Sequence, residues 1–198
     1  MIKKFFLKYI LIFLVFTTVA CSGLNFSQLA PEAIDYHPQR IAVFPIEVWN
    51  HKDIDSRTVV EQIVAGSLVK KKLFVNVVDT ENLQRQVLIS AELKKAKEEY
   101  LAKLQQLGFS DANLSKKIGE LLEVDAFLFL AVDEWKYTVK GDKKAAEVGL
   151  TMEMYDVATG KLVWKARHAT VRDYLLIQPE LPGLARDFVN KMIDYMPR

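Results

Sequence analysis

The sequence offers few side chains suited to nucleophilic or metal chemistry. It contains one cysteine, Cys21, and three histidines, His37, His51 and His168. No two of these histidines have the i, i+4 spacing of a metal site on a helix. His168 falls in an expected strand, where we expect it to be half-exposed and not a ligand. The histidines therefore do not predict a metal site.

The carboxylates do not suggest a catalytic pair either. Asp53 and Asp55 lie near His51, but their loop has too few oxygen ligands for calcium, and we expect these aspartates to cap the helix that follows. Asp133 and Glu134 are adjacent on an expected strand, so their side chains should point to opposite faces and cannot share a proton.

Two further motifs have a structural and a functional interpretation. Asp125 stands between a helix and an apolar strand, where a carboxylate either fixes the loop or belongs to a small site; we favour the first, because the sequence names no partner. Thr159-Gly160-Lys161 has the residue types that end a phosphate loop, but it lies in a hairpin and lacks the upstream glycine. We therefore expect no enzyme, no catalytic residue, no metal ligand and no cofactor.

The amino-terminal residues have the pattern of an export signal. Lys3, Lys4 and Lys8 precede the apolar run 9–16, and small residues lead to Cys21. The apolar run is much shorter than the ~20 residues that a spanning helix needs. We interpret residues 1–20 as a signal peptide, and residues 21–39, which contain Pro31 and Pro38, as a short linker.

The residues around the cysteine resemble a bacterial lipobox. The motif is Thr18-Val19-Ala20-Cys21, with Thr18 at a position that is usually aliphatic. The resemblance implies that Cys21 is lipidated and becomes the first residue of the mature protein. Ser22 follows in place of aspartate, which in a Gram-negative cell favours the outer membrane, with the domain facing the periplasm. The alternative is an ordinary signal peptide with a cysteine near its end by chance.

Composition indicates one folded domain, expected at residues 40–198. The chain is 51% hydrophobic, with 8 Gly and 6 Pro, and can bury a core without disulfides. Its 27 basic residues barely exceed its 25 acidic residues, and three of the lysines belong to the expected signal peptide. A nearly neutral domain gives no electrostatic reason to expect nucleic acid as a partner.

The apolar periodicity predicts an α/β (α+β) domain with a mixed β-sheet of about five strands and helices packed on it. The expected order is β-α-β-α-α-β-β-β-α. Residues 126–132 form a continuous apolar run, which predicts a central strand covered on both faces. The expected elements are strands at 40–49, 73–78, 124–139, 148–155 and 162–171 and helices at 57–71, 79–107, 111–122 and 180–195.

Two surface features have no assigned partner in the sequence. The charged stretch Glu92–Glu99 is either a docking element or a solvated helix face, and the second is the commoner outcome. An apolar stripe on one strand, with Trp135 and Trp164 on its neighbours, is either core or the wall of a ligand pocket. Its members are Val148, Leu150, Met152 and Met154.

The order of several motifs resembles the superfamily that holds the TolB amino-terminal domain, CsgG, PelC and LpoB. These motifs are Ile-Ala-Val-Phe-Pro at 41–45, Leu-Phe-Val-Asn-Val-Val-Asp at 73–79, Leu-Leu-Glu-Val-Asp-Ala-Phe-Leu-Phe at 121–129 and Tyr-Asp-Val-Ala-Thr-Gly-Lys-Leu-Val-Trp at 155–164. The resemblance covers roughly residues 40–196, and the short single-domain lipoproteins are the nearest members.

The resemblance implies a non-enzymatic, outer-membrane-anchored accessory component of an envelope export or secretion assembly, acting as a homo-oligomer or through partner contacts. The chain lacks an evident pair of long barrel hairpins, unlike CsgG, and a long tether, unlike LpoB. PelC-like behaviour close to the membrane fits better. The alternatives are an auxiliary ligand- or lipid-binding lipoprotein of a transporter, or a regulator of a cell-wall synthase.

Overall fold

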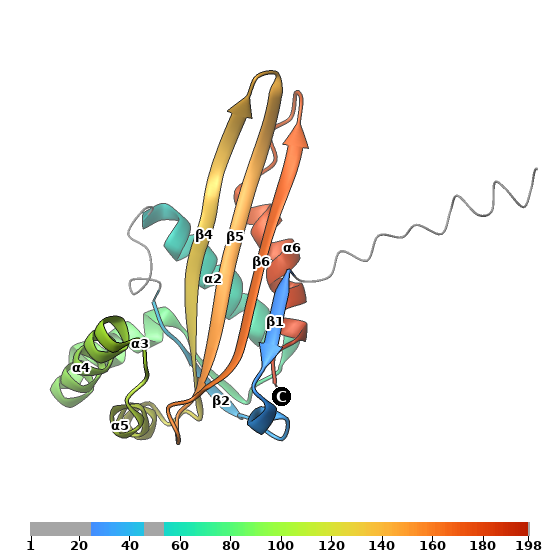
Figure 1. Cartoon of the computed structure of the whole chain (residues 1–198). Coiled ribbons are helices and arrows are strands. Elements are labelled where there is room, and N and C mark those ends of the chain that lie inside the picture. Colours follow the sequence, from blue (N-terminus) through green and yellow to red (C-terminus); the bar gives the residue numbers. More distant parts are fainter. Residues whose placement is uncertain (1–24, 46–53, 198) are drawn as a thin grey trace, which may run out of the picture.

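The computed structural model describes residues 25–45 and 54–197, and all described elements belong to one mixed sheet with its helices (Figure 1). The expected signal peptide, Cys21, Trp49, His51 and Asp53 lie outside the described residues. No described helix has the length and hydropathy needed to cross a membrane. The elements are β1 (Phe26–Leu29), a 3-10 turn η1 (Pro31–Ala33), β2 (Arg40–Val43), α2 (Ile54–Lys71), β3 (Asn76–Val78), α3 (Thr80–Ile89), α4 (Ala91–Leu107), α5 (Ala112–Leu122), β4 (Ala126–Lys140), β5 (Lys143–Asp156), β6 (Leu162–Tyr174) and α6 (Leu181–Asp194).

The six strands lie in the order β1-β6-β5-β4-β2-β3. β2 is parallel to β3 and to β4, while β4, β5 and β6 form an antiparallel meander. The α+β class, the parallel β2-α2-β3 unit and the central position of β4 are confirmed. The expected count of five strands is corrected to six, because β1 adds an edge strand.

β1 lies in the stretch that the sequence analysis assigned to the linker. It pairs antiparallel with β6, from Phe26 opposite Arg167 to Leu29 opposite Trp164. Its four residues are all exposed, so no buried periodicity marks the strand in the sequence. The folded domain therefore begins at least fourteen residues before Arg40, and the part of the chain left between Cys21 and the sheet is correspondingly short.

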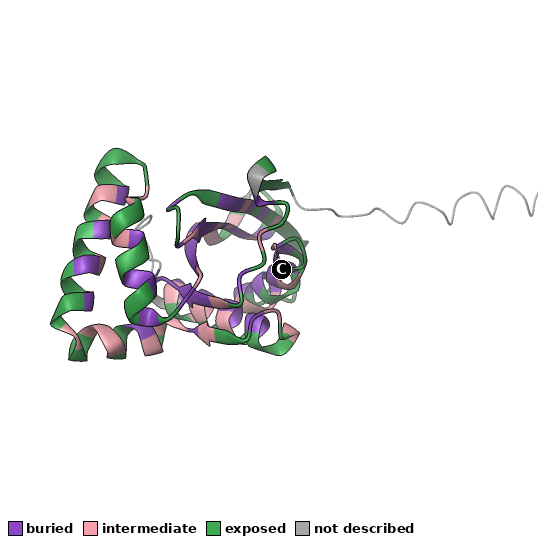
Figure 2. Cartoon of the chain, turned by 90° about the horizontal axis from the view of Figure 1, so that it is seen from below, coloured by how far each residue is buried: buried purple, intermediate pink, exposed green. Residues whose placement is uncertain are grey.

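Helices cover the two faces of the sheet unequally. α2 and α6 pack together over one face, whereas α3, α4 and α5 cover only the base of the other (Figures 1 and 2). The far halves of β4, β5 and β6 extend beyond α3, α4 and α5 as long paired strands (Figure 1). One side of this extension is therefore not covered by any helix within residues 25–45 and 54–197.

The apolar stripe of β5 is core. Val148, Leu150, Met152 and Met154 are at most 1% exposed and pack with Trp164 beneath α2 and α6. Trp135 is partly buried against the same cluster. These contacts remove the motive for a ligand pocket beside the two tryptophans.

Capping residues set several helix ends at positions that the apolar periodicity did not predict. The single helix expected from 79 to 107 is two helices, because the Ser90 side chain accepts the Leu93 N–H and starts α4. α2 begins at Ile54, three residues before the expected start at 57, so Asp55 lies in the first turn of the helix and not in a loop before it. Asp79 and Asp111 cap α3 and α5 with their carboxylates, and Gly108, with φ of 68°, ends α4.

Candidate functional site on the open face of the sheet

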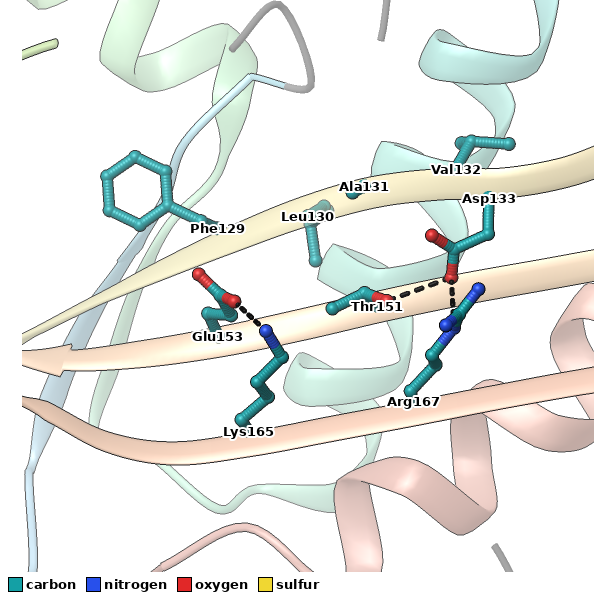
Figure 3. A pocket seen from close by; sticks show the side chains of 9 residues that line it. All are labelled: Phe129, Leu130, Ala131, Val132, Asp133, Thr151, Glu153, Lys165 and Arg167. Carbon is teal, nitrogen blue, oxygen red and sulfur yellow. Dashed lines mark hydrogen bonds and ion pairs between the residues drawn. The ribbon is translucent and has the colours of Figure 1, made fainter. Parts of the chain in front are cut away.

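The uncovered side of the meander is the candidate site, here called the open face. It holds a hollow of about 360 Å³ between β4, β5 and β6. Figure 3 shows its polar side chains projecting from neighbouring strands toward one another. The lining residues are Phe129, Leu130, Ala131, Val132, Asp133, Thr151, Glu153, Lys165 and Arg167.

A β-bulge sets the geometry of this face. Val132 pairs with Leu150 and Glu134 with Gly149, so Asp133 is the extra residue of β4. A Cβ atom at Gly149 would lie 3.4 Å from the Cβ atoms of both Asp133 and Glu134. Both acidic side chains therefore stand on the same face. The expectation that they point to opposite faces is wrong, because the bulge interrupts the alternation of the strand.

The hollow is lined by charges that neutralise one another. The Asp133 carboxylate accepts from Thr151 Oγ1 at 2.8 Å and from Arg167 Nε at 3.2 Å. Lys165 Nζ lies 2.6 Å from Glu153 Oε1 (Figure 3). In both ion pairs the base comes from β6, while the acid comes from β4 or β5.

Further out, the ion pairing continues. Lys136 pairs with Glu134 at 2.5 Å and with Glu147 at 3.6 Å. The hydrogen bond to Glu134 raises the pKa of Lys136, and the negative charges beside it add to this. At the opposite end, at the base of the sheet, burial, followed by the Glu153 charge, raises the pKa of Tyr155. Lys136 is therefore protonated and Tyr155 neutral near neutral pH.

The sequence alone did not predict that the polar side chains of the open face lie together. Thr151, Glu153, Lys165 and Arg167 alternate with core residues on β5 and β6, and that alternation indicated only a solvated side. Their meeting depends on the register of β5 with β6, which places Thr151 opposite Arg167 and Glu153 opposite Lys165. Cross-strand matching of acids with bases was the available signal.

Asp125 fixes the start of two parallel strands. Its Oδ2 accepts the backbone N–H groups of Gln39 and Arg40 at 3.1 and 3.0 Å, and its Oδ1 lies 2.9 Å from Arg40 Nη2. Burial favours a higher pKa for Asp125, but the hydrogen bonds and charge of Arg40 with the Gln39 N–H outweigh it and lower the pKa. The contacts support the loop-fixing interpretation of this residue.

The remaining expected site residues are dispersed. His168 is 7% exposed and its ring packs edge-on against Phe188 of α6, so the expectation of a half-exposed side chain is wrong. Its Nδ1 accepts the Asn25 N–H at 3.2 Å. His37 is exposed, and Gly160 has φ of 68° in the β5-β6 turn, as expected for turn chemistry. Within residues 25–45 and 54–197, no three His, Cys, Asp or Glu side chains are placed to hold a metal ion.

The charged part of α4 is a helix surface with several internal ion pairs. Glu92 pairs with Lys117 of α5 at 2.8 Å, and Lys103 pairs with both Glu99 and Asp111. The opposite side of α4 buries Leu93, Ala96, Tyr100 and Leu104 against the base of the sheet. Several charged side chains of α4 are therefore paired within the chain, as expected for a solvated helix face.

Comparison with known proteins establishes the fold. No family model matches the chain, and no curated protein matches it in sequence. The structure of the PelC dodecamer from Paraburkholderia phytofirmans is similar over 87% of this chain and 95% of that chain, with 19% identity and a TM-score of 0.53. The chain has the PelC fold.

Two further structures accompany that match. A PelC variant from the same organism covers 81% of this chain and 90% of its own, with 20% identity and a TM-score of 0.51. Lipoprotein GNA1162 from Neisseria meningitidis covers 80% of this chain and 100% of its own, with 17% identity and a TM-score of 0.46. At these identities the PelC similarity shows a shared fold, which agrees with the motif order in the sequence.

Proposed function

We propose that the chain is a non-enzymatic lipoprotein, anchored to the outer membrane through lipidated Cys21, with its domain in the periplasm. In this proposal it is an accessory component of an envelope export or secretion assembly. The observation that carries the proposal is the PelC fold, which extends over nearly the whole folded part of the chain. The leader ending at the only cysteine supplies the anchor.

The open face is the proposed contact surface with a second copy of the chain or with an envelope partner. Its acidic and basic groups form ion pairs in which the bases stay partly exposed, and such a surface selects partners by matching their charges. PelC was solved as a dodecamer, and we extend self-association to this chain on the strength of the shared fold.

The proposal is tested by measuring assembly. The chain without residues 1–20 and with Cys21→Ser is expected to form a defined oligomer in native mass spectrometry. Lys165→Glu combined with Arg167→Glu should dissociate it, because both basic groups of the hollow are reversed beside Glu153 and Asp133. Circular dichroism verifies that this variant folds.

A matched control carries the same change in charge elsewhere. Lys94→Glu combined with Lys95→Glu alters two exposed lysines of α4 and should leave the oligomer intact. A chain that stays monomeric at all concentrations and crosslinks to no envelope protein in cells would contradict the proposal. The intact mass of the membrane-extracted protein tests lipidation of Cys21 separately.

A further inference from the structure

The far end of the meander exposes a continuous run of apolar side chains. The loop after β6 carries Leu175, Leu176 and Ile177, which are 82%, 96% and 86% exposed. This loop and the β4-β5 turn at residues 139–144 together form the distal tip (Figure 1). Three consecutive apolar residues exposed to this degree, on a protein that buries a full core, indicate a surface with an apolar contact.

The apolar run is held in place. Tyr137 donates from its hydroxyl to the Pro179 carbonyl at 2.9 Å, and the Tyr137 and Tyr174 rings meet edge-on with centroids 6.3 Å apart. The two ends of the loop are thereby fixed to β4 and β6. The loop therefore presents the three side chains outward.

Basic groups and tyrosines surround the apolar residues. Lys143 and Lys144 in the turn and Arg172 on β6 are exposed beside the acids Asp142, Asp173 and, at the end of the loop, Glu180. An apolar centre with tyrosines and cations at its rim matches the layering of a lipid bilayer surface, where acyl chains lie below anionic headgroups.

The position of the amino terminus points to the same bilayer. At Asn25 the chain lies beside His168 and Ala169 of β6, and six residues separate Ala169 from Leu175, a rise of about 20 Å along a strand. Cys21 precedes Asn25 by four residues, a reach of about 14 Å at most. Since β1 is antiparallel to β6, the chain enters β1 from the side of the distal tip.

We infer that the distal tip contacts the bilayer in which Cys21 is anchored, with Leu175, Leu176 and Ile177 inserted at the acyl boundary and the lysines at the headgroups. The geometric part of this inference rests on the proposed lipidation. The chemical part does not, and it is tested without lipid on the protein. In this arrangement the strands of the meander run roughly perpendicular to the membrane plane, and the open face is directed parallel to that plane.

The test uses an environment-sensitive fluorophore. In the chain lacking residues 1–20 and carrying Cys21→Ser, Leu176→Cys labelled with nitrobenzoxadiazole is mixed with vesicles of phosphatidylethanolamine and phosphatidylglycerol. The emission should shift to the blue and be quenched by bromine atoms on the lipid chains. Ile89→Cys is the matched control, because Ile89 is 87% exposed on α3 beside the base of the sheet, and its emission should not shift.

Two further variants separate the components of binding. Leu175→Ser, Leu176→Ser and Ile177→Ser together should abolish sedimentation with vesicles without changing the thermal unfolding midpoint, since all three side chains are exposed. Lys143→Glu with Lys144→Glu should weaken binding to anionic vesicles.

The inference is overturned if position 176 behaves like position 89, or if a photo-crosslinker at 176 captures a protein in place of phospholipid in cells. Failure of lipidation at Cys21 would appear in the intact mass and leaves the vesicle result unaffected.

Discussion

At the scale of single residues, Asp125 shows how one carboxylate joins distant parts of the chain. Asp125→Asn removes the charge that Arg40 and two backbone N–H groups stabilise. We expect a loss of about 1 kcal/mol in unfolding free energy at neutral pH, because the carboxylate is about one-third exposed. The pKa of Asp125 is lowered in the folded protein, so its contribution is complete above the ordinary aspartate pKa of about 4 and is lost as the pH falls through the folded value. Urea unfolding measured between about pH 2 and 7 should show the stabilities of the two proteins converging in acid; a constant difference would contradict the assignment.

His168 gives a second prediction at the same scale, in a different pH range. Burial, followed by the charge of Lys191, lowers the pKa of His168 in the folded protein. Below the ordinary histidine pKa of about 6.5 the unfolded chain takes up a proton more readily than the folded one, so stability should fall as the pH decreases. His168→Asn keeps an acceptor for the Asn25 N–H and should flatten the urea-unfolding profile between about pH 5 and 7. An unchanged slope would show that His168 does not carry this dependence.

At the scale of elements, close packing between α5 and the β5-β6 turn makes a glycine necessary. A Cβ atom at Gly119 would lie 2.1 Å from Val157 Cγ1 and 3.1 Å from the Val124 carbonyl oxygen. We expect Gly119→Ala to destabilise the fold by about 1–3 kcal/mol through overpacking. Gly66→Ala is the control inside α2, where no atom lies within 4 Å; it should stabilise by about 0.5–1 kcal/mol. Thermal unfolding of both variants distinguishes packing from helix propensity, and equal effects would contradict this explanation.

The elements also show where sequence patterns succeed and fail. The alternation of apolar and polar residues predicted the meander, and the continuous apolar run at 126–132 predicted the central strand. Both predictions succeed because side chains buried at a regular spacing give a periodic pattern in the sequence. β1 has no such pattern, since all of its residues are exposed and its stability comes from pairing with β6. The bulge at Asp133 and the cross-strand pairs of the open face depend on register, which no single segment specifies.

At the scale of the whole molecule, β1 shortens the segment that joins Cys21 to the folded domain. The sequence suggested a linker of residues 21–39, but the sheet begins at Phe26, so a lipid on Cys21 would hold the domain against the membrane. Cys21→Ser should release a folded domain into the soluble periplasmic fraction and abolish function in cells. Full complementation of a deletion by this soluble form would contradict the proposed anchor.

Distance from the membrane can be separated from attachment to it. Inserting about 20 Gly and Ser residues after Ser22 retains Cys21 but adds a coil of about 25 Å in root-mean-square length. Because the distal tip and the open face are proposed to act at the membrane surface, we expect this variant to stay in the membrane fraction and yet lose most of its function. Membrane fractionation and complementation are measured on the same cells. A fully active variant would show that attachment alone suffices, and that the short approach from Cys21 to β1 does not position the domain.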